Sequence, residues 1–194
     1  SVVRAFIAID LGEDIRRHLD KVTETLAAEL ADLPLRWVPV ENIHLTLKFL
    51  GDVSTTNLGM LFDMVARDAA DARPFEVGVG KLGAFPNSTR PRVMWVGIEA
   101  TDELYQLQER IEGEVARFGY PPDRKPFEPH LTLARVSRNA SSADVRTIGE
   151  TLRKQSLGYL GAARVEAVHV FRSDLTPDGA VYTQLYSAPF DGVV

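Results

Sequence analysis

The chain has 194 residues, of which 45% are hydrophobic, and this is enough to fill the core of a globular domain. Its formal net charge of -5 argues against binding along duplex DNA or RNA, because such binding depends on clustered Lys and Arg side chains. The absence of cysteine excludes disulfides, thiolate zinc sites and cysteine nucleophiles, and no apolar run approaches the ~20 residues that cross a bilayer, so we expect a cytoplasmic protein without membrane contact.

The first half of the chain predicts alternating strands and helices. Val2–Ile9 is rich in β-branched and apolar residues, which indicates a buried strand. Apolar side chains then recur at three- and four-residue spacing, which is typical of amphipathic helices, over Glu13–Ala31 and Thr55–Ala72. Around these helices the sequence predicts extended segments at Leu35–Val38, at Ile43–Phe49 with an end at Gly51-Asp52, and at Phe75–Leu82, followed by a loop over Ala84–Pro91.

The same order of elements begins again in the second half. The predicted elements are a strand at Val93–Ile98, a helix at Asp102–Phe118, a strand at Leu131–Val136, a helix at Asp144–Leu152 and a strand at Arg164–Phe171. A turn at Thr176–Gly179, which is rich in typical turn residues, leads into a returning strand at Val181–Tyr186. We therefore predict one two-lobed domain over residues 1–194, with an internal repeat of roughly residues 1–90 and 91–194.

One tetrapeptide pattern occurs once in each half, as His44-Leu45-Thr46-Leu47 and as His130-Leu131-Thr132-Leu133. Side chains alternate between the two faces of a strand, so each copy places its His and Thr on one face and its two Leu on the other. Two such strands that face each other across a groove would direct two imidazoles and two hydroxyls at one small anionic group. A duplicated polar pair, on a face where apolar residues would pack better, favours a catalytic site over two structural histidines.

The two motifs together fit displacement at phosphorus. Imidazole titrates near pH ~6.5, so one of two histidines can be neutral while the other is protonated. The neutral one can take a proton from the attacking hydroxyl while the other protonates the departing oxygen, and Thr hydroxyls can donate hydrogen bonds to the non-bridging oxygens. We therefore predict that His44 and His130 are catalytic and that Thr46 and Thr132 bind phosphate, without a metal or other cofactor.

Other uses of these residue types have less support in the sequence. Zinc normally takes at least three protein ligands, and no third His, Cys or carboxylate stands beside the two motifs. A Ser-His-Asp triad would need a Gly-x-Ser-x-Gly elbow, which does not occur, and there is no Gly-rich phosphate loop. Of the two remaining histidines, we expect His18 on the surface of the first helix and His169 in a structural role.

These residues resemble the two-histidine phosphoesterase superfamily, and within it the RNA 2',3'-cyclic phosphodiesterases of bacteria and archaea, also called 2'-5' RNA ligases. The resemblance covers essentially the whole chain. One His-x-Thr motif is weak evidence, whereas the pair with its flanking residues is highly specific. The segments that carry the resemblance are Arg4–Ile9, His44–Gly51, Pro91–Gly97, Pro129–Arg135 and Phe171–Leu175.

The resemblance implies an α+β fold with two lobes, in which two antiparallel sheets line a central cleft, helices lie outside and a pseudo-twofold axis passes through the site. It implies metal-free hydrolysis of a terminal 2',3'-cyclic phosphate to a 2'-phosphate, with His44 as the acid and His130 as the base. It also implies that Arg135 contacts phosphate. Strict alternation from His130 would put Arg135 on the opposite face, so we expect a strand end or a β-bulge there.

The identity of the substrate leaves alternatives open. Phe6, Lys48 and Arg92 are candidate substrate contacts, although Phe6 fits a buried core aromatic equally well. Two local basic clusters could hold a nucleic-acid end or a nucleotide, namely Arg90 with Arg92 and Arg124 with Lys125. We predict a monomer that acts on RNA with a 2',3'-cyclic phosphate terminus. The alternatives are a small cyclic phosphate or nucleotide as substrate, reversible 2'-5' ligation, and a binding module for a nucleotide or an RNA end. The intact pair of His and Thr argues against the binding module.

Overall fold

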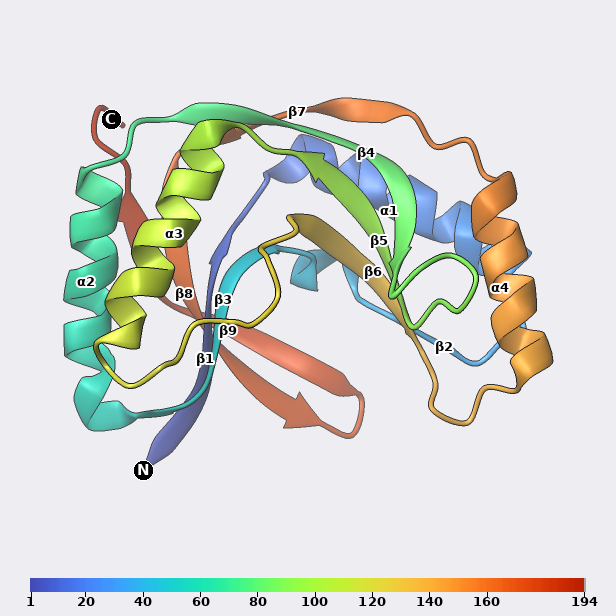
Figure 1. The fold of residues 1–194 in the computed structure, drawn as a ribbon, viewed down its shortest axis with the longest axis horizontal. Helices are drawn as coiled ribbons and strands as arrows, with labels where there is room; N and C mark the ends of the chain where they lie inside the picture. The colour runs from blue at the N-terminus through green and yellow to red at the C-terminus, as the bar shows by residue number, and fades with distance from the viewer. Residues whose placement is uncertain (194) are drawn as a thin grey trace.

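The computed structural model describes residues 1–193, which form two antiparallel sheets, four α-helices and two short 3-10 helices (Figure 1). Sheet A has the order β3-β1-β8-β9 and consists of β1 (Val2–Ile9), β3 (Leu45–Ser54), β8 (Ala167–Thr176) and β9 (Gly179–Pro189). Sheet B has the order β2-β6-β5-β4-β7 and consists of β2 (Leu35–Trp37), β4 (Phe75–Phe85), β5 (Val93–Glu99), β6 (His130–Val136) and β7 (Tyr159–Val165). The predicted fold class, with helices added to two antiparallel sheets, is confirmed.

Each sheet takes strands from both halves of the sequence. In sheet A, β1 pairs with the first His strand, β3, and also with β8 from the C-terminal half. In sheet B, β5 pairs with the second His strand, β6, and also with β4 from the N-terminal half. The two sheets therefore repeat one arrangement around their His strands, β3-β1-β8-β9 and β6-β5-β4-β7. This correspondence makes β3 and β6 structurally equivalent.

The helices lie outside the sheets, as expected (Figure 1). On one side of the molecule α2 (Leu58–Ala70) packs against β8 and β9, next to α3 (Asp102–Ala116), which packs against β3. On the other side α1 (Glu13–Glu29) packs against β7, and α4 (Ser142–Lys154) meets the loop after β4, where Arg153 donates a hydrogen bond to the Ser88 carbonyl at 2.7 Å. None of the helices in residues 1–193 is both long enough and apolar enough to cross a membrane.

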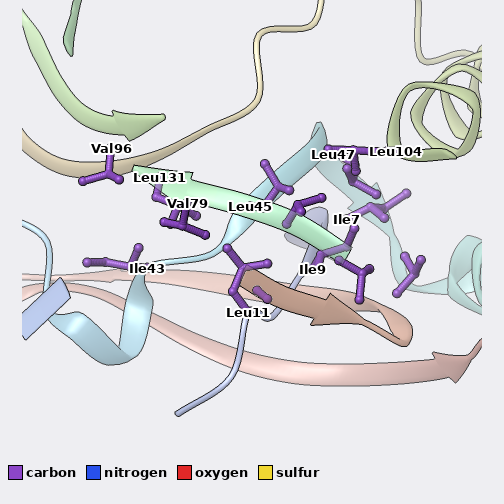
Figure 2. Close-up of a cluster of buried hydrophobic side chains, with 14 of the residues drawn as sticks. Ile7, Ile9, Leu11, Ile43, Leu45, Leu47, Val79, Val96, Leu104 and Leu131 are labelled. Atoms are coloured by element: carbon purple, nitrogen blue, oxygen red, sulfur yellow. The ribbon is translucent and has the colours of Figure 1, made fainter. Parts of the chain in front are cut away.

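One apolar cluster connects the two sheets (Figure 2). It includes Ile7 and Leu45 from sheet A together with Val79, Val96 and Leu131 from sheet B, and each of these side chains is at most 1% exposed. Burying one such side chain typically stabilises the folded state by ~1.5–3 kcal/mol. The strands that carry the two His motifs are thus anchored from behind by a shared core.

Several predicted strand limits are wrong. The strand that begins at Phe75 continues to Phe85, into the predicted loop, and β9 extends beyond the predicted Val181–Tyr186 at both ends. Two further errors have identifiable reasons. Gly51 does not end the first His strand, because it lies at a bulge in the pairing with β1, with φ at +68°, and the strand continues to Ser54. The single strand predicted over Arg164–Phe171 is divided at Glu166 into β7, which pairs with β4, and β8, which pairs with β1. Alternation of apolar residues continues through this change of sheet and does not reveal it. The predicted hairpin of β8 and β9 is confirmed.

A buried carboxyl group lies between α2 and α3. Asp68 is 2% exposed, and burial together with the neighbouring Glu114 carboxylate raises the pKa of Asp68 to about 7, while Arg110 and Arg67 oppose this shift. The pKa in the folded state therefore lies above the value of ~3.9 expected for an unfolded chain. The contribution of Asp68 to stability is accordingly full below that lower value and is lost as the pH rises through about 7.

Replacement of Asp68 by Asn should remove this pH dependence. The amide keeps the shape of the side chain but cannot ionise, so we expect the variant to gain ~2 kcal/mol relative to the wild type between pH ~5 and pH ~8. Denaturant unfolding at the two pH values measures this difference, with Asp20→Asn on the exposed side of α1 as the control. A difference between the Asp68 variant and the wild type that is the same at both pH values would contradict the proposed ionisation.

Candidate active site

A β-bulge in β6 decides which way Arg135 points. Thr132 and Ala134 pair with successive residues of β5, so Leu133 is the extra residue on β6. Leu133 and Ala134 are both buried, and Arg135 then returns to the face that carries His130 and Thr132. The expected bulge between His130 and Arg135 is therefore confirmed.

The first His strand contains the same bulge. Thr46 and Lys48 pair with successive residues of β1, which makes Leu47 the extra residue on β3. Leu47 and Lys48 are both buried, and Phe49 returns to the face of His44 and Thr46, where it is 67% exposed. The two motifs are thus six residues long, His-x-Thr-x-x-Phe in β3 and His-x-Thr-x-x-Arg in β6.

Both motifs line one cleft of about 800 Å³ between the two sheets. As predicted, the two Leu residues of each motif are buried in the core, at 2% exposure or less. The cleft brings together all five residues predicted for catalysis and phosphate binding: His44, Thr46, His130, Thr132 and Arg135. Its remaining walls include Phe49, Phe85 and the loop that precedes β6.

The two imidazoles are oriented in the same way. His44 Nδ1 lies 3.1 Å from the carbonyl oxygen of Asn42, and His130 Nδ1 lies 2.6 Å from the carbonyl oxygen of Glu128. Each carbonyl belongs to the residue two positions before the histidine. Because a carbonyl oxygen can only accept a hydrogen bond, Nδ1 carries a proton in both rings, and Nε2 is the atom available for proton transfer.

The electrostatic surroundings of His44 favour its neutral form in the free protein. Burial lowers the pKa of His44, while the Asn42 carbonyl and the Asp10 carboxylate act in the opposite direction. Burial also opposes ionisation of Asp10, but the backbone N–H of Gly12 at 2.9 Å and the guanidinium of Arg16 at 2.7 Å outweigh it and lower the pKa of Asp10. A phosphate anion near His44 would favour the imidazolium and raise its pKa again.

Aromatic side chains support both imidazoles. The ring centroid of His44 lies 4.4 Å from that of Phe171, and the rings of His130 and Phe85 form a T-shaped pair with centroids 4.9 Å apart. Phe6 stacks on Phe171 at 5.3 Å and is only 4% exposed. Phe6 therefore lies beneath the cleft surface, which favours its interpretation as a packed aromatic over stacking on a base.

His169 lies closer to the site than the sequence suggests. It pairs with Ala8, which pairs in turn with Thr46, so the three side chains form one row across the cleft face of sheet A. Burial lowers the pKa of His169, and in residues 1–193 its Nδ1 is buried without a hydrogen-bond partner. The charge of His169 also contributes to lowering the pKa of His44. His18, in contrast, is exposed on α1, as expected.

Lys48, a predicted substrate contact, lines the cleft, but its ammonium is already bound by groups of the protein. It is 3% exposed, and its ammonium donates hydrogen bonds to Glu112 Oε1 at 2.6 Å, to the Pro121 carbonyl at 2.9 Å and to Asp123 Oδ1 at 3.3 Å. Burying an ammonium is tolerated only with such partners. Lys48 therefore holds α3 and the loop after it against β3, and its charge is already engaged.

One predicted substrate contact does not line the cleft, and one residue that does line it was not predicted. Arg92 is exposed immediately before β5, outside the set of cleft residues. Phe49 was missed although it is exposed beside His44. An alignment of the two motif copies would have found it, because Phe49 occupies the position that Arg135 has in the second copy.

Two equivalent strands that present a His and a Thr to one cleft define a phosphoesterase of the two-histidine class. The profile of the LigT like Phosphoesterase family matches residues 9–95 and again residues 96–182, so the chain belongs to this family. It is 37% identical over 185 residues to the RNA 2',3'-cyclic phosphodiesterase of Methanothermobacter thermautotrophicus, with 94% of this chain and 96% of that protein covered. The protein of the same name from Thermotoga maritima is 30% identical over 190 residues, covering 98% and 97%.

Solved structures agree with this assignment over nearly the full chain. TT0787 of Thermus thermophilus superposes with a TM-score of 0.80 at 30% identity, covering 97% of this chain and 98% of that one. LigT of Escherichia coli, in a crystal structure with 3'-AMP, superposes with a TM-score of 0.77 at 26% identity, covering 98% and 99%. The duplicated arrangement of two sheets is thus the fold of this family.

Proposed function

We propose that this protein is an RNA 2',3'-cyclic phosphodiesterase, which hydrolyses a terminal 2',3'-cyclic phosphate to a 2'-phosphate by general acid and base catalysis. The observation that carries the proposal is the convergence of two imidazoles, two Thr hydroxyls and one guanidinium in a single cleft. The names of the two curated relatives support the same substrate. The cytoplasmic location and the monomeric state remain predictions.

The difference between the two motifs supports distinct roles for the two histidines. A base that stacks on the exposed ring of Phe49 places its ribose, and with it the leaving O3' atom, on the side of His44. On the opposite side, Arg135 can bind the non-bridging oxygens of the phosphate, next to His130. Water then attacks from the side of His130. We therefore assign His44 as the acid and His130 as the base.

The reaction follows from these positions. His130 Nε2 accepts a proton from water while the water oxygen forms a new bond to phosphorus. The bond from phosphorus to O3' breaks, and His44 Nε2 gives its proton to O3', which becomes the free 3'-hydroxyl. Thr46 and Thr132 donate hydrogen bonds to the non-bridging oxygens as negative charge builds there. Exchange of one proton with solvent at each histidine restores the starting state.

The direct test is hydrolysis of an oligonucleotide with a 2',3'-cyclic phosphate terminus by the purified protein in excess EDTA. We expect a product with a 2'-phosphate and a free 3'-hydroxyl, formed at an undiminished rate. Within residues 1–193, no three His, Cys, Asp or Glu side chains lie close enough together to hold a metal ion. Activity that disappears in EDTA and returns with a divalent metal would overturn the proposed mechanism.

The same experiment separates the alternatives. In 2'-5' ligation a 5'-hydroxyl attacks the same phosphorus in place of water, and O3' leaves. An oligonucleotide with a 5'-hydroxyl, added to the assay, would therefore reveal joined product. Water at high concentration favours hydrolysis as the net direction. A binding module would bind the RNA end without changing it, and a preference for a small cyclic phosphate would appear as a higher kcat/KM for that substrate.

Phe49→Ala tests the proposed base platform. Stacking of a base on an aromatic ring contributes ~1–3 kcal/mol, so we expect kcat/KM to fall by about fivefold to 150-fold. The Tm should change little, because the ring is 67% exposed. Phe49→Tyr keeps an aromatic face and serves as the matched control, with near-normal kcat/KM. If Ala and Tyr at this position gave equal kcat/KM values, the base would have to bind elsewhere.

A further inference from the structure

The loop between α3 and β6 forms one wall of the cleft. Because α3 packs against β3 of sheet A and β6 belongs to sheet B, this loop crosses from one lobe to the other (Figure 1). Six successive residues of the loop, Asp123 to Glu128, line the same cleft as the two His motifs. A ligand that extends beyond the His pair can therefore meet this loop.

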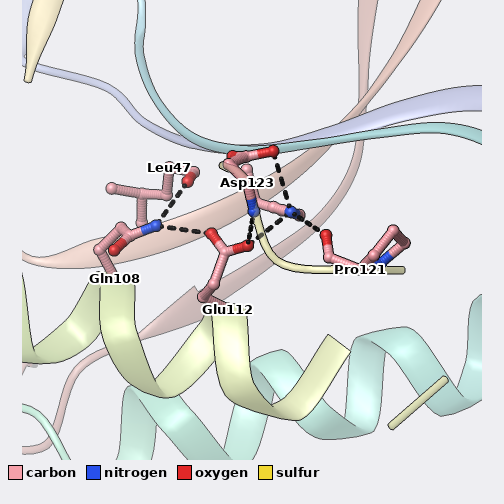
Figure 3. Close-up of polar contacts among 6 residues, drawn as sticks. Leu47, Gln108, Glu112, Pro121 and Asp123 are labelled. Atoms are coloured by element: carbon pink, nitrogen blue, oxygen red, sulfur yellow. Dashed lines mark hydrogen bonds and ion pairs between the residues drawn. The ribbon is translucent and has the colours of Figure 1, made fainter. Parts of the chain in front are cut away.

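The loop is fixed to the site by polar contacts to the buried ammonium of Lys48 and to Glu112. The ammonium of Lys48, the fifth residue of the first His motif, binds the Pro121 carbonyl and the Asp123 carboxylate. Glu112 on α3 accepts hydrogen bonds from Lys48 and from the backbone N–H of Asp123 at 2.9 Å, and it is held in turn by Gln108 at 2.9 Å (Figure 3). The loop next to Asp123 is thus positioned before a ligand arrives, which reduces the entropic cost of binding there.

This network also determines the charge that the loop presents. Arg124 and Lys125 are exposed and line the cleft, while Asp123 and Glu112 beside them both bind Lys48, whose single charge offsets one of the two carboxylates. Glu128 is the acidic residue at the other end of the lining segment, and its carbonyl holds His130. Two adjacent cations at the rim of a cleft, in a chain with a net charge of -5, are a local exception that indicates an anionic ligand.

We infer that Arg124 and Lys125 bind the internucleotide phosphate that joins the terminal nucleotide of the RNA to its neighbour. This inference rests on the proposed function and adds a second subsite to it. The terminal cyclic phosphate occupies the centre formed by the histidines and Arg135, so a second cationic centre in the cleft suits a second phosphate. Phe49, the proposed base platform, and the loop line the same cleft. The subsite would make an oligonucleotide end a better substrate than a mononucleotide.

The test compares two dinucleotides that both end in a 2',3'-cyclic phosphate. One has an ordinary phosphodiester between its nucleosides, and the other has an uncharged methylphosphonate at that place. At low salt we expect the wild type to prefer the charged linkage by roughly tenfold in kcat/KM, as for two partly screened ion pairs. The preference should fall to near unity in the Arg124→Ala/Lys125→Ala variant. Arg146→Ala/Lys154→Ala removes the same two charges from the exposed side of α4 and should retain the preference.

Salt dependence gives a second readout that a structural role would not change. For a single strand, log(kcat/KM) should fall with log salt by ~0.7 per phosphate contact. Arg124 and Lys125 contact one phosphate, so the double variant should lose about 0.7 from the wild-type slope with the charged dinucleotide. A double variant that retains the linkage preference and the slope, or that loses kcat/KM equally with both dinucleotides, would overturn the inference. Failure of the wild type to hydrolyse either dinucleotide would instead overturn the proposed function.

Discussion

Replacement of His44 or His130 by Ala is expected to lower the rate of hydrolysis by at least ~10², the usual contribution of a positioned acid or base. Both groups act in one displacement, so the double variant should be little slower than either single variant. Single-turnover hydrolysis measures the chemical step without interference from product release. His18→Ala, on the exposed side of α1, is the control and should leave the rate unchanged.

The hydrogen bonds of the two rings allow a sharper version of this test. The side-chain amide of His44→Asn can still donate to the Asn42 carbonyl, and that of His130→Asn to the Glu128 carbonyl, but neither can transfer a proton. We therefore expect the Asn variants to fold normally, to bind the RNA end and to be as slow as the Ala variants. Near-normal turnover in an Asn or Ala variant at either position would show that this histidine is not catalytic.

The parts of the structure that follow from local sequence were predictable. The spacing of apolar residues identified α1 almost to the residue, because an element buried on one face repeats its pattern within a few residues, and a run of β-branched and apolar residues identified β1. The same argument placed the paired His and Thr on one face and the Leu residues in the core. Alternation on a strand is a local property, so no knowledge of the partner strands was needed.

The parts that depend on distant residues were not predictable from one sequence. Lys48 seemed free to contact substrate, but its charge is taken up by Glu112 and Asp123, which come from another half of the chain. The division of β7 from β8 at Glu166 depends on which sheet each strand joins. The equivalence of Phe49 and Arg135 lay within reach, because a shared bulge follows once the two motif copies are aligned.

The pH dependence of hydrolysis should distinguish the two histidines from the two Thr residues. If one histidine must be neutral and the other protonated, the rate follows a bell whose limbs report the macroscopic titrations of the pair. Burial lowers the pKa of His44 in the free protein, so as the proposed acid it should bring the alkaline limb of kcat/KM below the usual range of an imidazole. Bound phosphate favours the imidazolium, so the alkaline limb of kcat should lie at higher pH than that of kcat/KM.

Replacement of Thr46 or Thr132 by Val should lower the height of this bell and leave its limbs in place. Val has nearly the shape of Thr but lacks the hydroxyl that holds a phosphate oxygen, and removal of one such donor typically costs ~3 kcal/mol or somewhat less, about 10² in the rate of the chemical step. The hydroxyl does not exchange the reacting proton, so the titrations of the histidines should persist. Pre-steady-state measurement of the chemical step across the pH range decides between these roles. A flat profile in the wild type would mean that the histidines do not share the proton transfers, and a shifted limb in a Val variant would mean that the Thr hydroxyl takes part in them.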